Sequence, residues 1–284
     1  MILQKKTYLW VRNKKTNAMK HLFLLLAAGL MAVSCIFSFG GGTMVGFCTE
    51  EGIDFTDVRD VDPFHALSSS LPCNVYYEQA DVQEVRVEST EEFAGKVLTE
   101  VEDGTLKLKL EPGRYPKLIL RVVVSSPDIE SLRVSGSGNL VNEGGLRTGG
   151  GMDLKVSGSG DIRTGAIDSK DFTAHCSGSG SLRVDRISCT GFSATVGGSG
   201  SIVAQTLQAH GKVSARISGS GRIRLEDATV DGDMVLSTSG SGSITVNGSC
   251  HDVTATTSGS GSISGNLAYD HISTHTSGSG QVRL

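Results

Sequence analysis

The chain is poor in aromatic side chains, in proline and in long apolar runs. Aromatic residues make up 5% of the sequence and Trp10 is the only tryptophan, which disfavours a carbohydrate site built on aromatic platforms. No proline follows Pro127, and no stretch after residue 100 shows the three-and-four apolar spacing of an amphipathic helix. The absence of that spacing argues against helical structure in the C-terminal part of the chain.

An excess of basic residues is also absent, since 26 Lys and Arg stand against 30 Asp and Glu. Residues 1–34 hold six of the basic residues and no acid, so the rest of the chain has 20 basic and 30 acidic residues, a formal charge of −10. Binding to phosphate backbones needs a net basic surface. Nucleic acid is therefore not an expected partner.

The first 34 residues have the pattern of a secretory signal peptide. A short basic segment that begins at Met19 precedes an apolar run, and small residues precede Cys35. The run is too short to span a bilayer comfortably. We expect residues 1–34 to be cleaved, with Met19 as the true start. We also expect Cys35 to carry a lipid, because the residues before it resemble a lipobox; ordinary cleavage without lipid attachment is the alternative. Residues 35–56 are then a lipid-attached tether, and the protein is an outer-membrane lipoprotein of the cell envelope.

The tripeptide Gly-Ser-Gly occurs eight times after residue 130, in steps of 19 to 22 residues. A repeat this short cannot bury an apolar face alone, so neighbouring repeats must stack on a common core. Glycine lets stacked backbones approach closely at a turn, and it also reaches positive φ. We expect structural turns at these glycines: Gly136, Gly138, Gly158, Gly160, Gly178, Gly180, Gly198, Gly200, Gly219, Gly221, Gly240, Gly242, Gly259, Gly261, Gly278 and Gly280.

The residues before each turn alternate between apolar and polar side chains, as Phe172, Ala174 and Cys176 illustrate in the third repeat. This alternation is the pattern of a strand with one buried face. The second residue after each turn is always aliphatic. The sequence therefore predicts an all-β, single-domain, parallel β-helix-like solenoid, right-handed because right-handed crossovers dominate between parallel strands. Eight coils occupy residues 131–284, and residues 57–130 form an irregular β part that caps them.

Two outward columns, three residues before and three after each turn, carry basic side chains over the first five coils. They form a possible anion-binding face for an acidic polymer. The alternative, which the nearby carboxylates of Asp153, Asp161 and Asp185 favour, is an ordinary solvated surface. The cations of the possible face are Arg133, Lys155, Arg163, Arg183, Arg216 and Arg224.

No catalytic site, metal site or cofactor is predicted. Polysaccharide cleavage needs paired acids a few ångströms apart, whereas the carboxylates of the first coils fall in different phases of the coil. His271 and His275 would lie about 13 Å apart on one strand face, too far to share a metal. The carboxylates in question are Asp153, Asp161, Asp168, Asp171 and Asp185.

The cysteines have structural interpretations. Cys48 and Cys73 are candidates for a disulfide in an oxidising compartment. Cys176 occupies an inward column where valine is usual, so it is expected to act as a small buried hydrophobe rather than as a reactive thiol.

A set of motifs before the repeats points to a known family. In order, the motifs are Pro63-Phe64, Cys73 to Gln79, Val85 to Glu88, Glu100 to Lys107 and Val122 to Pro127. Together with the Ser-Gly-Ser-Gly repeats, they resemble the head GIN domain family of putative autotransporter adhesins over roughly residues 57 to 280. The resemblance implies a secreted protein of Bacteroidetes with a β-helix-like superhelix, similar to pectin lyase folds but without their catalysis. Cys73 departs from the small or apolar residue expected at its position.

These observations favour a cell-envelope lipoprotein that is not an enzyme, an adhesin that presents a repetitive surface to a cell-surface or envelope polymer. A carbohydrate-binding or polysaccharide-active β-helix is the alternative, and a groove where Arg163 and Arg183 meet carboxylates would favour it. A third possibility is another envelope protein as partner, bound through the last coil near Val282.

Overall fold

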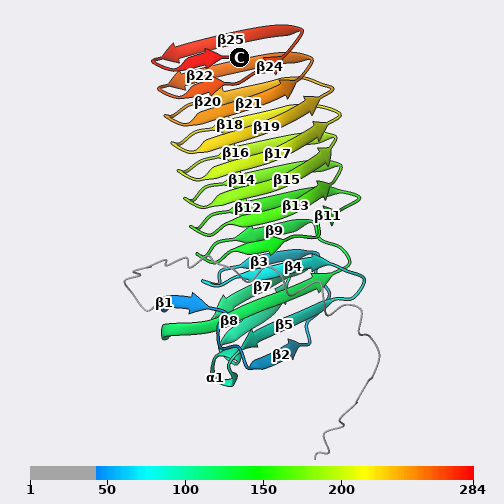
Figure 1. Cartoon of the computed structure of the whole chain (residues 1–284), viewed down its shortest axis with the longest axis vertical. Coiled ribbons are helices and arrows are strands. Elements are labelled where there is room, and N and C mark those ends of the chain that lie inside the picture. The colour runs from blue at the N-terminus through cyan, green and yellow to red at the C-terminus, as the bar shows by residue number, and fades with distance from the viewer. Residues whose placement is uncertain (1–42) are drawn as a thin grey trace, which may run out of the picture. The chain divides into compact units, whose positions relative to one another are not determined.

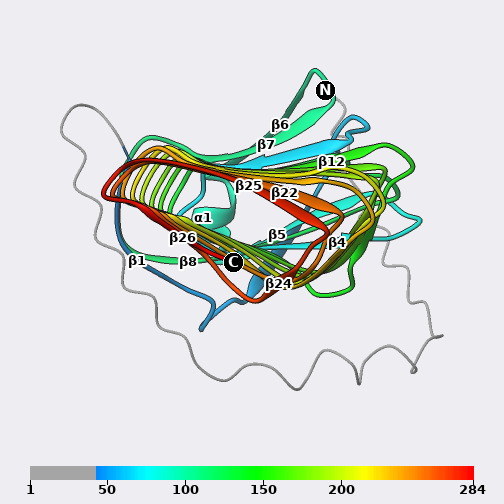
Figure 2. The same ribbon diagram turned by 90° about the horizontal axis from the view of Figure 1, so that it is seen from above.

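The computed structural model describes residues 43–284, which form two large β-sheets and one four-residue helix, α1 (Glu91–Ala94). One sheet has eleven strands and the other has fifteen. Figure 2 looks down the stack and shows the two sheets facing each other across a narrow interior. The predicted all-β solenoid is confirmed.

The two sheets divide the strands as follows. The eleven-stranded sheet runs in the order β6 (Val97–Glu102), β7 (Thr105–Leu110), β3 (Ala66–Ser69), β9 (Ser131–Val134), β12 (Gly151–Val156), β14 (Asp171–Cys176), β16 (Gly191–Val196), β18 (Val213–Ile217), β20 (Met234–Thr238), β22 (Asp252–Gly259) and β25 (His271–Gly278). The main path of the fifteen-stranded sheet is β2 (Phe55–Arg59), β5 (Glu84–Ser89), β8 (Arg114–Ser126), β4 (Val75–Gln79), β10 (Leu140–Asn142), β13 (Ile162–Asp168), β15 (Ser181–Cys189), β17 (Ser201–Ala209), β19 (Arg222–Val230), β21 (Ser243–Ser249), β23 (Ser262–Ser264) and β26 (Gln281–Arg283). Three further strands join it from the side: β1 (Met44–Thr49) on β8, β11 (Leu146–Arg147) on β13 and β24 (Leu267–Ala268) on β21.

Each Gly-Ser-Gly repeat gives one strand to each sheet, with the glycine turn between them, as the even steps of Figure 1 show. Neighbouring coils pair in parallel, and equivalent residues of the repeats lie opposite each other, for example Phe172 opposite Phe192 and Ile162 opposite Leu182. The eight repeats form about seven turns of solenoid. The period found in the sequence is therefore the period of the structure.

The alternating apolar residues form one continuous core. The rings of Phe172 and Phe192 stack with centroids 5.5 Å apart, and both side chains are buried. Burial of each large apolar side chain contributes roughly 1.5–3 kcal/mol. Ile272 of β25 occupies the position that Phe172 and Phe192 occupy in their strands. It is 38% exposed, because no further strand stacks on β25 within residues 43–284.

The turn glycines are required by close packing more than by their backbone angles. Only two of the predicted turn glycines, Gly259 and Gly278, have positive φ. A Cβ atom on Gly160 would lie 1.9 Å from the carbonyl oxygen of Gly138 in the neighbouring coil, and one on Gly180 would lie 1.9 Å from that of Gly160. Stacked turns therefore leave no room for a side chain.

One coil of the stack has no Gly-Ser-Gly turn. β3 pairs with β9, and β4 pairs with β10, so residues 66–79 form a coil below the first repeat. In its turn, Leu71 and Cys73 stand where the repeats have glycine, and the turn lies against Gly136 and Gly138. The motif that marks the other coils is absent here, which is why the sequence places this segment in the irregular part.

The rest of the cap continues both sheets, as predicted for a single domain. β5 pairs antiparallel with β8 and with β2, while β6 and β7 form an antiparallel hairpin. The hairpin turns at Asp103 and Gly104, both with positive φ. These antiparallel strands cover the base of the parallel stack and so complete its core.

The predicted tether is wrong from residue 44 onward. β1 pairs in parallel with β8, and Cys48 forms a disulfide with Cys73, so the candidate pair is joined. The signal peptide, the start at Met19 and lipid attachment at Cys35 lie outside the described residues. Within residues 43–284, no helix has the length and apolar character needed to cross a membrane.

Candidate functional site

The six cations of the possible anion-binding face do not share one surface. Three lie on the eleven-stranded sheet and three on the fifteen-stranded sheet, whose outer faces point away from each other in Figure 2. The single basic tract inferred from the sequence is therefore two separate groups. Arg133, Lys155 and Arg216 belong to β9, β12 and β18, and Arg163, Arg183 and Arg224 belong to β13, β15 and β19.

Half of these cations are neutralised by carboxylates close in space. Arg133 lies 3.3 Å from Asp153, and Arg163 lies 3.3 Å from Asp161. Both carboxylates are among those that the sequence predicts to neutralise the tract. Arg224 lies 3.5 Å from a neighbouring glutamate on its own strand. Exposed pairs of this kind contribute at most about 1 kcal/mol each, so these three pairs are ordinary surface ion pairs.

The outer face of the eleven-stranded sheet carries a regular array of hydroxyl groups. On β14, β16, β18, β20, β22 and β25, eight of the twelve residues in the two central outward columns are Ser or Thr, and all twelve are at least partly exposed. Equivalent residues are register neighbours, so the hydroxyls repeat at about 4.8 Å from strand to strand. We call this surface the hydroxyl face; it comprises Thr173, Ser193, Thr195, Ser214, Ser237, Thr254, Thr256 and Ser273.

A shallow depression of about 440 Å³ adjoins the hydroxyl face near the cap. Arg133 on β9, Asp153 on β12 and Asp171 at the start of β14 line it, together with His65 and Glu130. The guanidinium of Arg133 also donates a hydrogen bond from Nε to the hydroxyl of the serine two residues before it, at 3.1 Å. The structure thus brings two of the predicted carboxylates and one predicted cation together.

The sequence does not identify His65 and Glu130 as members of this depression. They precede β3 and β9, which are paired neighbours, and His65 accepts a backbone hydrogen bond from Glu130 at 2.8 Å. Their proximity depends on the coil at residues 66–79, which carries no glycine motif. If residues 66–79 are aligned as a further coil, His65 and Glu130 fall at the depression.

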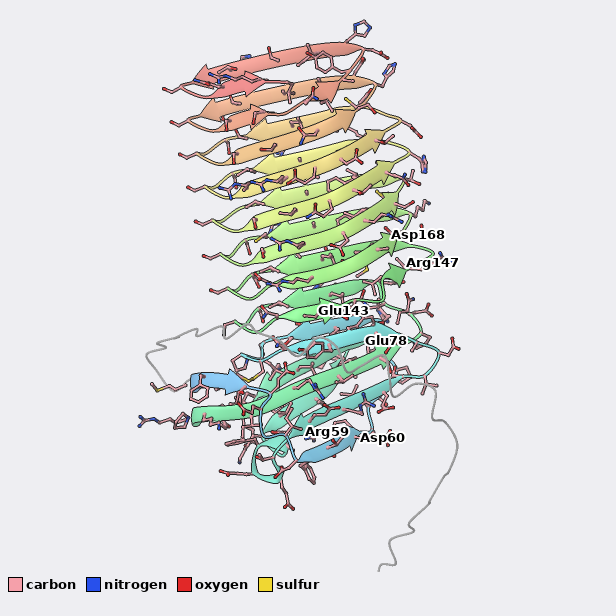
Figure 3. The ribbon with its side chains drawn as sticks, viewed as in Figure 1. Arg59, Asp60, Glu78, Glu143, Arg147 and Asp168 are labelled. Carbon is pink, nitrogen blue, oxygen red and sulfur yellow. A yellow bond between two sulfur atoms is a disulfide. The ribbon has the colours of Figure 1, made fainter. Side chains whose placement is uncertain are left out.

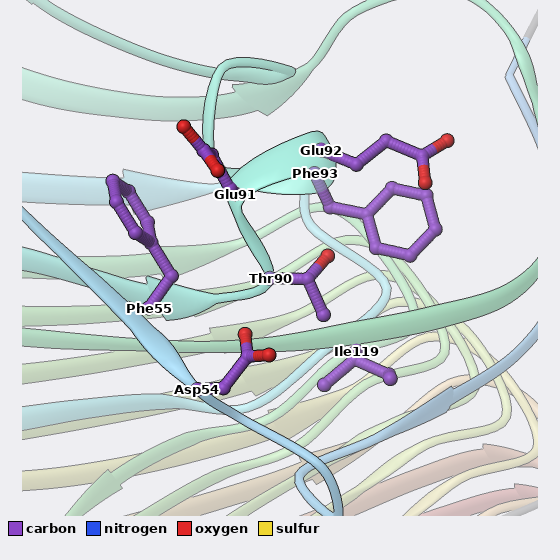
Figure 4. A pocket seen from close by; sticks show the side chains of 7 residues that line it. All are labelled: Asp54, Phe55, Thr90, Glu91, Glu92, Phe93 and Ile119. Atoms are coloured by element: carbon purple, nitrogen blue, oxygen red, sulfur yellow. The ribbon is translucent and has the colours of Figure 1, made fainter.

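A second hollow of about 520 Å³ lies in the cap, between α1, β8 and the start of β2. Figure 4 shows its lining, in which Phe55, Phe93 and Ile119 supply apolar surface and Asp54 and Glu91 supply carboxylates. Phe55 is 36% exposed. The hollow combines apolar side chains with acids and the hydroxyl of Thr90, and its lining residues include no Lys, Arg, His or Cys.

The opposite edge of the stack, where the chain returns from one sheet to the other, is held by polar contacts. Arg147 lies 3.4 Å from Asp168 on the next coil, and Figure 3 shows this pair on the edge above Glu78 and Glu143. The side chain of Gln79 binds both the backbone N–H and the carbonyl of Arg147, at 2.7 and 2.8 Å. Asp168 is therefore a structural partner here, away from the depression.

Two tyrosines of β4, the half-buried Tyr76 and the buried Tyr77, have displaced pKa values. Burial, and a hydrogen bond of 2.9 Å donated to the carboxylate of Glu50, raise the pKa of Tyr76 to about 12. Burial raises the pKa of Tyr77 to about 12 as well, and its hydroxyl lies 2.8 Å from that of Ser126. Both phenols therefore stay neutral at physiological pH and serve the packing of β4.

The three free cysteines of the described region are buried, and burial raises the pKa of each thiol, that of Cys189 to about 12. Cysteine nucleophiles act as thiolates, which form at lowered pKa values. These thiols are therefore inert core groups, as predicted for Cys176.

Comparison with known proteins extends these observations. The family model described as "Putative auto-transporter adhesin, head GIN domain" matches residues 63–233 and 210–284. No curated protein matches the chain.

Three solved structures are similar in fold. A putative lipid binding protein from Parabacteroides distasonis has a TM-score of 0.73 and 21% identity, covering 82% of this chain and 97% of that chain. A putative adhesin from the same organism has a TM-score of 0.69 and 18% identity, with coverage of 82% and 98%. A putative adhesin from Bacteroides fragilis has a TM-score of 0.60 and 17% identity, with coverage of 84% and 99%. Likeness at these identities shows a shared fold.

Proposed function

Because the chain belongs to the putative auto-transporter adhesin, head GIN domain family, we propose that it is a non-catalytic adhesin of the cell envelope whose hydroxyl face binds a surface polymer. The observation that carries this proposal is the regular array of uncharged hydroxyls on the eleven-stranded sheet. A polymer with repeating hydroxyl groups presents hydrogen-bond donors and acceptors at a fixed period. The Ser and Thr hydroxyls of a parallel sheet also present donors and acceptors at a fixed period.

The two outer faces of the stack differ in a way that favours this choice. In the column three residues after each turn, the fifteen-stranded sheet has arginine at Arg163, Arg183 and Arg224. The central columns of the hydroxyl face contain one arginine, Arg216, and no carboxylate on β14 to β25. A neutral polymer therefore meets few charged groups that it must desolvate on this face.

A pair of matched variants tests the proposal. Thr195→Glu places a carboxylate in the middle of the hydroxyl face, and Thr245→Glu places one at an outward threonine of β21 on the opposite sheet. Affinity for a cell-surface glycan, measured by pull-down on insoluble polysaccharide, should fall at least about tenfold for Thr195→Glu alone, because an unpaired buried charge costs more than 1.4 kcal/mol. Equal binding by both variants, or no binding by the unmodified protein, would contradict the proposal.

Attachment of the protein through lipidated Cys35 and display on the outer membrane are part of the same proposal. Protease treatment of intact cells, with a periplasmic marker and lysed cells as controls, tests the location. Loss of the protein from intact cells supports surface display. Protection until lysis would restrict its partner to an envelope polymer or envelope protein on the periplasmic side.

The depression at Arg133 favours a second candidate, a carbohydrate-binding or polysaccharide-active site. There, Asp153 lies 3.3 Å from Arg133, and Asp171 lines the same depression. The test is Asp171→Asn: loss of oligosaccharide binding or of polymer cleavage would support this candidate, while unchanged polymer binding would leave the hydroxyl face as the site.

A further inference from the structure

A cluster of potential metal ligands lies at the return corner of the last coils, where the chain passes from the fifteen-stranded sheet back to the eleven-stranded sheet. Asp233 precedes β20, His251 precedes β22, Asp252 is the first residue of β22, and Asp270 precedes β25. Three successive coils thus contribute to one cluster. Backbone hydrogen bonds between these corners, such as that from Asp270 N–H to the carbonyl of His251 at 2.8 Å, fix their spacing.

The imidazole of His251 is at the centre of the cluster. Its Nδ1 lies 3.4 Å from a carboxylate oxygen of Asp233 and 3.6 Å from Oδ1 of Asp252. One ligand atom from each of these three residues lies within 4.8 Å of the other two. On the far side of the ring, Nε2 lies 3.5 Å from Asp270.

The charges of this cluster are not balanced by protein groups. Within residues 43–284, no Lys or Arg side chain forms an ion pair with Asp233, Asp252 or Asp270. Oδ1 of Asp252 is buried and has no hydrogen-bond partner, although it is directed at His251. A buried carboxylate oxygen without a partner is costly, and a cation between the ligands would remove that cost.

The distances suit a transition metal. Zinc binds histidine nitrogen and carboxylate oxygen at about 2.0–2.2 Å in tetrahedral geometry, which puts neighbouring ligand atoms roughly 3.3–3.6 Å apart. Nδ1 of His251 has the required separations from Asp233 and Asp252. A nitrogen ligand favours zinc over magnesium or calcium, which prefer all-oxygen sites.

We propose that Asp233, His251 and Asp252 bind one divalent metal ion of the zinc class, with water at the fourth position. Asp270 acts as the outer partner: it accepts the Nε2 proton of His251 and so directs the Nδ1 lone pair toward the metal. The ion links the corners of neighbouring coils through side chains. It therefore fastens the part of the stack that includes β25, the strand with the least covered core column.

The neighbouring corner supplies a matched control. His210 and Asp231 form a pair at 2.8 Å, and both side chains are well exposed. This pair resembles the His251 site in residue type, but among residues 43–284 it has no third ligand within reach. His210→Ala should therefore leave metal binding intact.

The test is titration of the full, untagged mature chain, stripped with chelator, with Zn²⁺ in a calorimeter. We expect one equivalent to bind, a loss of at least about tenfold in affinity in Asp252→Asn and in His251→Ala, and unchanged binding in His210→Ala. At a hundredfold excess over Kd, Zn²⁺ should raise Tm by roughly 5–10 °C. It should also slow hydrogen exchange in β20, β22 and β25.

Three results would overturn the proposal: no saturable binding of Zn²⁺, undiminished binding by both His251→Ala and Asp252→Asn, or tighter binding of Mg²⁺ than of Zn²⁺. Circular dichroism of each variant without metal shows whether it is folded. Since all three altered side chains are at least partly exposed, the variants should fold, and Asp252→Asn preserves the shape of the site.

Discussion

Replacement of a single turn glycine by alanine should destabilise the whole stack. In Gly160→Ala, the new methyl carbon would lie 1.9 Å from the carbonyl oxygen of Gly138, a backbone atom that no rotamer change can move away. Real Cβ atoms essentially never come closer than 3.0 Å to such an atom, so the two turns must separate by more than about 1 Å. That shift also stretches the hydrogen bonds of 3.2 Å that Ser159 and Gly160 donate to Gly136.

Overpacking costs 1–3 kcal/mol in typical cores, and we expect about 3 kcal/mol here because the clash involves backbone on both sides. Alanine restricts the unfolded chain and returns about 0.4–1 kcal/mol of this. The net loss should lower Tm by roughly 4–10 °C in a domain of this size, measured by circular dichroism at 218 nm.

The control is Gly144→Ala, in the loop after β10, where an added Cβ meets nothing within 4 Å. Its stability should change by less than about 0.5 kcal/mol. If both variants lose the same stability, backbone entropy or strand propensity explains the glycines, and the close approach of stacked turns does not. A stable Gly160→Ala protein would refute the packing argument directly.

Three further predictions concern the cap and the core. Loss of the disulfide in a Cys48→Ala, Cys73→Ala protein should lower the free energy of unfolding by about 3.5 kcal/mol, the loop entropy of a separation of 25 residues, as measured by urea unfolding. Phe172→Ala should cost about 3–5 kcal/mol in the same assay, because it opens a cavity beside the stacked ring of the next coil. The folded pKa values of Tyr76 and Tyr77 are raised to about 12 from 10.0, so the stability that these two neutral phenols contribute should be complete below pH 10 and lost as pH rises through 12. Absorbance at 295 nm should show both phenols ionising at this high pH. Tyr76→Phe should reduce the loss of stability at high pH.

The repeat architecture is predictable from the sequence because its cause is local. A glycine is needed wherever two turns touch, and an apolar residue is needed wherever a strand faces the core, so both recur at the coil period. The segment at residues 66–79 is a coil without this glycine signal. Its turn contains Leu71 and Cys73, which fit because the adjoining turn supplies the glycines Gly136 and Gly138. In each touching pair the later turn needs glycine, because its Cβ would meet the backbone carbonyl of the turn before it.

The structure differs from the predicted tether and from the predicted single basic tract for different physical reasons. Residues 44–49 are ordered by a long-range partner, β8, and by a disulfide to Cys73, neither of which leaves a periodic signal nearby. Arg133 and Arg163 are both exposed, as predicted for outward columns. An outward residue before a turn and one after it nevertheless belong to opposite sheets, since the chain reverses direction between them.

The structure also suggests where a solenoid of this kind can carry specific chemistry. Inward columns hold mostly apolar residues, with a buried threonine at Thr238 and Thr257, and turn columns hold glycine, because equivalent neighbours lie about 4.8 Å away on either side. Outward columns repeat in register, which suits the recognition of a repeating polymer but not a unique site. The return corners vary in length and sequence, so residues such as Asp233, His251 and Asp252 can converge there without a counterpart in every coil. A single-ion site and a polymer-binding face can therefore coexist on one stack without competing for the same positions.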